Sequence, residues 1–234
     1  MESQSQPDAP LPPSSAREKR SRRWMWGIWV VGMLSVLGVA SLYPLVVVKR
    51  QARSELESAA RNLRSLGFGM LDFVSEYGSF PSDKTIAEVD ADVPEHGIPL
   101  GTATSNDYFR QLIASGLVQS ETIFHAGFTP RPDDVMIGSR ALEKGECSCA
   151  YLRNIPASDP TAPVIVFPLL KGTLKADTKL CAKWGNKAAV LFVDNRVITL
   201  PVDASGRVIF KGRDLFDPAQ PFWHGTSPDV VWPE

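Results

Sequence analysis

The feature that most constrains this chain is a run without charged side chains that covers residues 24–48. Trp24, Trp26 and Trp29 lie at its start, and basic residues flank it on both sides. A helix of this length rises about 37 Å, whereas the hydrocarbon core of a bilayer is about 30 Å thick. A buried core helix rarely lacks a polar face over such a length, and a signal peptide would be shorter and followed by a cleavage site. The run therefore predicts a single transmembrane helix.

Basic residues are distributed unevenly around this run. More of them precede it than follow it, which favours a cytoplasmic N-terminus and an extracytoplasmic C-terminal domain. They are Arg17, Lys19, Arg20, Arg22 and Arg23 before the run, and Lys49, Arg50 and Arg53 after it. Residues 1–16 are rich in Ser, Pro and Gln, so residues 1–23 are predicted to be a disordered basic tail. We expect a single-pass protein of the inner (cell) membrane, with the lipid bilayer as its first partner.

Apolar residues continue after the run in a heptad pattern, with alternating spacings of four and three residues. The members of this seam are Ala52, Leu56, Ala59, Leu63, Leu66, Met70, Phe73 and Tyr77. They predict an amphipathic helical continuation over residues 49–78, which either forms a coiled coil with other helices or faces the core of its own domain. Gly67 and Gly69 weaken this helix locally or allow close packing, and Gly78 ends it.

The remaining residues, 79–234, predict one α+β extracytoplasmic domain. Residues 79–104 are punctuated by Pro and Gly, and a helix is expected to follow with Ser105 or Asn106 as its N-cap. Short β-branched or apolar runs then predict strands separated by turns. These runs are 150–153, 164–169, 188–193, 197–200 and 208–210, followed by an irregular Pro-rich tail over residues 214–234.

The predicted fold class combines these elements. It is α+β, with a long N-terminal transmembrane-plus-amphipathic spine helix packed on a small antiparallel β-sheet. The predicted divisions are residues 1–23, 24–48, 49–78 and 79–234. A hairpin turn at Asp194-Asn195 is expected to join two of the strands.

This order of parts resembles the type IV pilin and type II secretion pseudopilin superfamily. Residues 61–67 and 76–81 (Glu-Tyr-Gly-Ser-Phe-Pro) look like the helix end and helix exit of proteins related to the major pseudopilin. Residues 189–197 are similar to the late hairpin of pseudopilin-like families in planctomycete and verrucomicrobial bacteria. The resemblance implies a pilin fold and a structural subunit or accessory of a type II secretion or type IV pilus-like system. It also implies pilin-like partners that bind through the helix seam.

The chain departs from these families at the processing site. Counting back from Pro44, the cleavage glycine falls on Arg22 and the glutamate of the mature helix on Gly27. A slipped alignment places the cut after Gly27 and puts Gly32 where the glutamate belongs. This departure favours a relative of pilins that stays uncleaved in the membrane. The alternative function is a bitopic envelope-binding module with a pilin-derived fold and no assembly role.

Aromatic residues in the tail are the surface that such a binding module would use. The same residues could instead staple the tail onto the sheet. They are Phe216, Phe222, Trp223 and Trp232.

Other chemistry is sparse in the sequence. A net charge of −1 does not favour a nucleic-acid partner. His96, His125 and His224 have no partner at ligand or triad spacing, and the sequence has no phosphate-binding loop or nucleophile elbow. We therefore expect no enzyme, no cofactor and no small-molecule substrate, and assign no catalytic, cofactor-binding or metal-binding residue.

Two possibilities are left open. One disulfide could join Cys181 to either Cys147 or Cys149 outside the cytoplasm, leaving one free thiol. The resemblance also raises calcium, which the major pseudopilin binds near its C-terminus, although the oxygen-bearing residues in that region are more typical of turns and caps. Those residues are Asp203, Ser205, Asp214, Asp217 and Asp229.

Overall fold

The computed structural model describes residue 33, residues 53–126 and residues 130–234. Contacts divide the chain into two compact units, Met1–Arg50 and Gln51–Glu234. The predicted tail 1–23 and, apart from Met33, the predicted membrane span 24–48 lie outside the described residues. The fold below is therefore that of the second unit.

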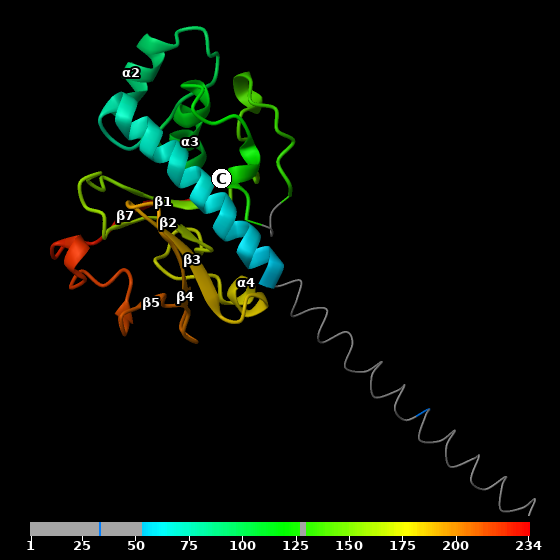
Figure 1. Ribbon diagram of the computed structural model, residues 1–234, viewed down its shortest axis with the longest axis vertical. Helices are drawn as coiled ribbons and strands as arrows, with labels where there is room; N and C mark the ends of the chain where they lie inside the picture. The colour runs from blue at the N-terminus through cyan, green and yellow to red at the C-terminus, as the bar shows by residue number, and fades with distance from the viewer. Residues whose placement is uncertain (1–32, 34–52, 127–129) are drawn as a thin grey trace, which may run out of the picture. The chain divides into compact units, whose positions relative to one another are not determined.

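A helix occupies residues 53–77 (Figure 1). Its buried stripe follows the predicted seam, so the seam faces the core of its own domain, one of the two alternatives that the pattern allowed. The fully buried members are Ala59, Leu63, Leu66, Met70 and Phe73. The helix ends as predicted, because Gly78 adopts a φ of 74° and its N–H donates to the Val74 carbonyl at 2.8 Å.

Five antiparallel strands form the main sheet in the order β4-β3-β2-β1-β7. Their bounds are Ala150–Arg153 (β1), Pro163–Phe167 (β2), Lys187–Phe192 (β3), Val197–Pro201 (β4) and Asp229–Val231 (β7). A separate two-stranded ladder pairs Ile209–Phe210 (β5) with Arg213–Asp214 (β6). The four strands β1 to β4 lie where the sequence predicts them, to within two residues, and Asn195 takes the positive φ of 60° that a tight β3–β4 turn requires.

Short helices complete the unit. The α-helices are Thr85–Asp92 (α2), Ser105–Ala114 (α3) and Thr178–Lys183 (α4), and the 3-10 helices are Glu121–Phe124 (η1), Gly138–Arg140 (η2) and Pro221–Trp223 (η3). The cap of α3 is Thr104, one residue before the predicted position. Thr104 and Asp107 form a reciprocal capping box, which satisfies donors that the first helical turn leaves unpaired.

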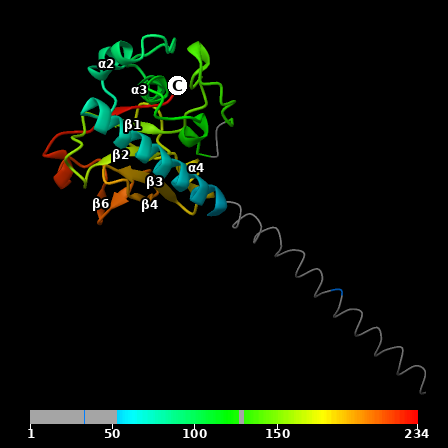
Figure 2. The same ribbon diagram turned by 45° about the horizontal axis from the view of Figure 1, so that its top comes forward.

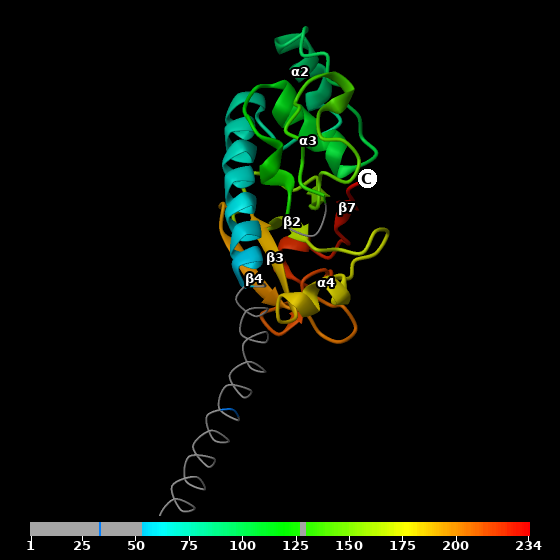
Figure 3. The same ribbon diagram turned by 90° about the vertical axis from the view of Figure 1, so that its right-hand side faces the viewer.

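The sheet is covered on both faces at β3. Figures 1 and 2 show the 53–77 helix crossing the sheet, and Figure 3 shows it along one side of the unit. Leu191 of β3 lies against Gly67 of this helix. Its neighbour Phe192 points to the opposite face, where its ring lies 5.6 Å from that of Phe210. Residues 188–192 are consequently buried throughout rather than on alternate positions.

The predicted fold class is wrong in one element. The α+β content and the antiparallel sheet are present, but the described residues contain no helix that is both long and apolar enough to cross a membrane. The 53–77 helix is long, yet charged side chains recur along it and its apolar stripe is used to cover the sheet. These charged residues are Arg53, Glu55, Glu57, Arg61, Arg64, Asp72 and Glu76.

Candidate functional site

The acids that the sequence singled out near the C-terminus do not gather in the structure. Asp203 caps its own turn: one carboxylate oxygen accepts from the Ser205 N–H at 2.9 Å, and the other from Arg207 Nε at 2.7 Å. Hydrogen bonds from the Ser205 hydroxyl, at 2.7 Å, and from the Arg207 side chain lower the pKa of Asp203. Asp229 instead pairs with Arg153 at 2.8 Å, across the β1–β7 ladder. They are therefore turn and pairing residues in the described chain.

The tail aromatics are largely buried. Phe216, Phe222 and Trp223 belong to the hydrophobic core, and Trp223 Nε1 donates to the Leu215 carbonyl at 2.7 Å. Trp232 is partly buried against the same core. The tail aromatics therefore pack the tail onto the rest of the domain and do not form an exposed binding surface.

The three cysteines are buried free thiols, so the structure does not contain the bridge from Cys181 that the sequence allowed. Cys181 lies in α4, whereas Cys149 Sγ donates to the Phe124 carbonyl at 3.6 Å. Burial raises the pKa of the Cys181 thiol to about 11. A thiol held this way is a packing residue rather than a nucleophile at neutral pH.

The three histidines lie in separate parts of the described chain. His96 Nδ1 accepts from the Ile98 N–H at 2.9 Å, and its Nε2 lies 2.9 Å from an Asp90 oxygen. Burial is the main cause that lowers the pKa of His125. His224 is exposed and adopts a left-handed conformation at the end of η3.

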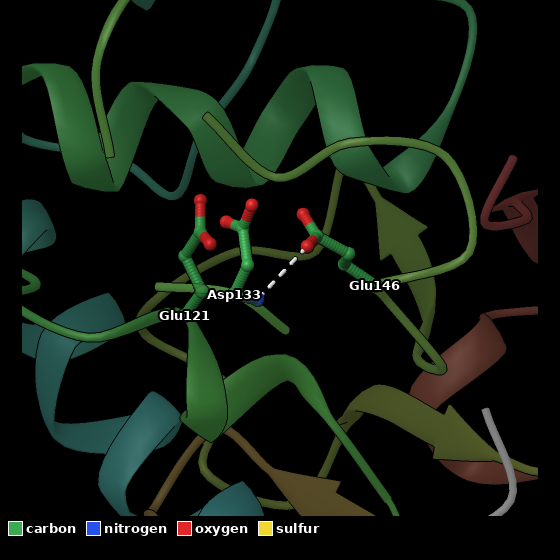
Figure 4. A group of neighbouring side chains, drawn as sticks. All are labelled: Glu121, Asp133 and Glu146. Atoms are coloured by element: carbon green, nitrogen blue, oxygen red, sulfur yellow. Dashed lines mark hydrogen bonds between the residues drawn. The ribbon is translucent and has the colours of Figure 1, made fainter. Parts of the chain in front are cut away.

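One group of acids does converge, and the sequence had not indicated it. Glu121, Asp133 and Glu146, which we call the acidic triad, each place a carboxylate oxygen within 4.8 Å of the other two (Figure 4). Glu121 begins η1, Asp133 lies in the following connection, and Glu146 precedes β1. Glu121 and Glu146 are buried, with 0% and 8% exposure, while Asp133 is exposed.

Backbone N–H groups orient the triad. Glu121 accepts from the Leu142 N–H at 2.5 Å. The two oxygens of Glu146 accept from the N–H groups of Asp133 at 3.1 Å and Glu143 at 2.6 Å. Each bond crosses between segments or closes a turn, so the carboxylates are held in place by main chain rather than by flexible side chains.

Negative charge in the triad is incompletely balanced. Arg140 forms an ion pair with Asp133, but Glu121 Oε2 is buried and has no hydrogen-bond partner. Burial raises the pKa of Glu121, and the nearby carboxylates of Glu146, Asp133 and Asp134 add to the rise, against the Leu142 hydrogen bond that lowers it. The side chains can therefore take up a positive charge, either a proton or a cation.

Nothing in the linear sequence marks this group. Its members are twelve and thirteen residues apart, in segments without regular periodicity. The one available signal is that Glu121 directly follows Ser120, and this pair is typical of a helix cap. Only the burial of Glu121 distinguishes it, and burial at this point depends on the tertiary fold.

No protein-family model matches the chain, and no curated protein and no solved structure gives a significant match.

Proposed function

We propose that the chain is a membrane-anchored, pseudopilin-like structural subunit or accessory of a type II secretion or type IV pilus-like system. The observation that carries this proposal is the order of parts. A basic cluster and the uncharged run 24–48 are followed at once by an amphipathic helix that covers an antiparallel sheet. The run would tether the chain in the inner membrane, with its second unit outside the cytoplasm.

Side chains that often act in catalysis are dispersed or buried in the described residues. In the described residues the histidines lie apart in local contacts, and the thiols are buried. The buried acids are the exception, and a cation or a shared proton accounts for them without catalysis.

Contacts with neighbouring subunits would use the outward side of the 53–77 helix, because its seam is occupied by the sheet. Phe68 is 58% exposed on that side, between Arg64 and Asp72. Arg61 and Arg64 precede Phe68 on this helix, and Asp72 and Glu76 follow it, so a like helix shifted along its axis would place opposite charges beside each other. We propose pilin-like subunits as the partners.

Site-specific photocrosslinking in native membranes tests this function. A photoreactive phenylalanine analogue at Phe68 is expected to form adducts with pilin-like subunits. The matched control is the same analogue at Leu170, which is also exposed, at 42%, but lies outside the helix. Equal adducts from both positions, or a chain that fractionates without the membrane, would contradict the proposal.

The missing cleavage glycine and glutamate favour a second candidate, the envelope-binding module without an assembly role. The intact mass of the chain from native membranes separates the two candidates. Loss of about 22–27 residues with an added methyl group supports assembly. A full-length chain that crosslinks to an envelope component instead of pilin-like subunits supports the binding module.

A further inference from the structure

The carboxylate of Glu121 is the least satisfied buried group in the triad. Its residue has 0% exposure, and Oε2 has no hydrogen-bond partner. A buried acceptor without a partner costs about 1–3 kcal/mol, and more when it is charged. This oxygen belongs to the same carboxylate that meets Asp133 and Glu146 within 4.8 Å. The triad therefore contains a buried carboxylate oxygen whose hydrogen-bonding capacity is unused.

In the described part of the chain, the ion pair of the triad involves its outer acid and not the buried ones. Arg140 pairs with Asp133, and its side chain is 54% exposed, so it neutralises the outer acid and leaves the two buried ones. Like charges held this close repel strongly when water is excluded. One monovalent partner against three carboxylates leaves the triad with an excess of negative charge.

We propose that the acidic triad binds one hard divalent cation, Ca²⁺, between the carboxylates of Glu121, Asp133 and Glu146. The site goes beyond the structural function proposed above and does not depend on it.

The donor atoms select the class of ion. All three side chains offer oxygen, which suits Ca²⁺, Mg²⁺ and Mn²⁺ rather than the softer metals that prefer thiolate or imidazole. Oxygens on opposite sides of a Ca²⁺ ion lie about 4.6–5.2 Å apart, because each bond is about 2.3–2.6 Å long. The triad spacing fits inside this shell. Exposed Asp133 leaves one side open to water, which can complete the larger coordination number of Ca²⁺.

The surrounding loops are already fixed in the arrangement that the ion needs. Arg110 of α3 donates to the carbonyls of Ala141 at 2.8 Å and Leu142 at 3.1 Å. Asn106 donates to the same Leu142 carbonyl at 3.0 Å. These bonds anchor the segment that leads to Glu146, while its Leu142 N–H orients Glu121. A bound ion would join the three segments that carry Glu121, Asp133 and Glu146, none of which lies in a β-strand.

Calcium binding is measured directly on the full chain, purified in detergent and stripped of metal with a chelator. Equilibrium dialysis against radioactive Ca²⁺, from about 0.01 to 5 mM, is expected to give one ion per chain with half-saturation between about 10⁻⁵ and 10⁻³ M. Mg²⁺ should compete only in large excess. Saturating Ca²⁺ should also raise the melting temperature by several degrees.

Two isosteric variants give the contrast. Glu121→Gln should weaken Ca²⁺ binding by roughly tenfold or more and remove the thermal shift, because it withdraws the buried charged ligand. Glu143→Gln is the matched control: it makes the same chemical change at an exposed acid outside the triad and should bind as the parent does. If Glu121→Gln does not fold, Asp133→Asn replaces it, with the same expected loss.

Two results would overturn the proposal. The first is no Ca²⁺ bound by the parent chain at about 5 mM, which would assign the balancing charge to a shared proton. The second is equal Ca²⁺ binding by the triad variants and Glu143→Gln, which would place the bound ion elsewhere. Neither result would affect the crosslinking expected from Phe68, so the cation site and the proposed function stand or fall separately.

Discussion

Asparagine side chains hold several of the loops around the core. Asn62 Nδ2 donates to the carbonyls of Thr122 and His125, each at 2.8 Å, and so ties the 53–77 helix to η1. Asn106 is fully buried; its amide donates to Leu142, and its oxygen accepts from the Glu234 N–H at 3.2 Å. Each amide replaces backbone pairing that these irregular segments lack. At the scale of residues, loop order depends on a few side chains.

Cys181 gives a pH-dependent prediction at this scale. Its folded pKa is raised to about 11 from an ordinary value of 9.0, so the protonated thiol is favoured by folding. The resulting stability is fully present below pH 9.0 and is lost as pH rises through about 11. The full loss amounts to about 2–3 kcal/mol. We expect the free energy of unfolding, measured by denaturant titration, to fall over this window.

The control for this prediction is Cys181→Ala, which lacks the titrating group. Its unfolding free energy should fall less steeply over the same pH range, although it will be lower at neutral pH because a buried side chain is shortened. Identical slopes for the parent and the variant would show that Cys181 titrates normally. Native-state alkylation of the thiol by iodoacetamide should likewise stay slow near neutral pH.

At the scale of elements, the contact between the 53–77 helix and the β3–β4 hairpin depends on a glycine. A Cβ built at Gly67 would lie 2.1 Å from Asn195 Oδ1 and 3.0 Å from Leu191 Cδ1. The helix backbone therefore approaches the hairpin more closely than a side chain allows. The cost of glycine in a helix, about 1 kcal/mol, is offset by this packing.

Substitution Gly67→Leu tests that contact. Leucine favours helix more than glycine, so any loss of stability reports the clash. We expect destabilisation by about 1–3 kcal/mol or more, from displacement of the hairpin. Phe68→Leu, at the adjacent exposed position, should change the unfolding free energy by less than about 0.5 kcal/mol. A Gly67→Leu variant as stable as the parent would mean that the hairpin can move away at little cost.

Elements with strong local patterns could be predicted from the sequence, and those without them could not. The strands β1 to β4 are β-branched or apolar runs between turn residues, and the heptad stripe specified the buried face of the 53–77 helix. Helix α2 lies within residues 79–104, where Pro and Gly did not indicate a helix; it buries just Thr85 and Val89, so its apolar pattern is weak. Strand β7 was missed because Asp229–Val231 is short, lies among prolines and pairs with a strand far away in the sequence.

At the scale of the whole molecule, the second unit is closed by its C-terminal segment. Strand β7 pairs with β1, and the Trp232 carbonyl accepts from the Ser105 N–H at 3.0 Å. Phe222, Trp223 and Val230 are buried in the same core as the 53–77 helix. The tail is therefore a structural part of the fold rather than an appendage.

Truncation tests this closure. A chain that ends after Arg213 loses buried aromatic residues and β7, and we expect it not to fold cooperatively, as judged by near-ultraviolet circular dichroism and by protease resistance. A chain that ends after Ser227 loses only β7 and the following residues, and should fold with reduced stability. If the chain that ends after Arg213 unfolds as cooperatively as the parent, the tail is not needed to hold the fold together and this prediction is wrong.

The acidic triad could not be predicted from the sequence, because its three carboxylates meet only in the folded molecule. Glu121 is an ordinary acid in a polar segment until the fold buries it, and Asp133 and Glu146 meet it only because α3 holds the intervening loop. Conversely, Asp203 and Asp214 have the composition of a calcium loop, but their carboxylates cap nearby N–H groups. Ligand geometry here follows from long-range packing, which no local pattern encodes.

The pairing of β7 with β1 also determines how late in synthesis the sheet can be completed. Sixty-four residues separate Phe167, the end of β2, from Val231, the end of β7. At about 5–20 residues per second, a ribosome needs roughly 3–13 s to make them. During that interval β1 has a neighbour on one side only, and its other edge can pair with a foreign strand. A chaperone that holds nascent chains would have its greatest effect in this window.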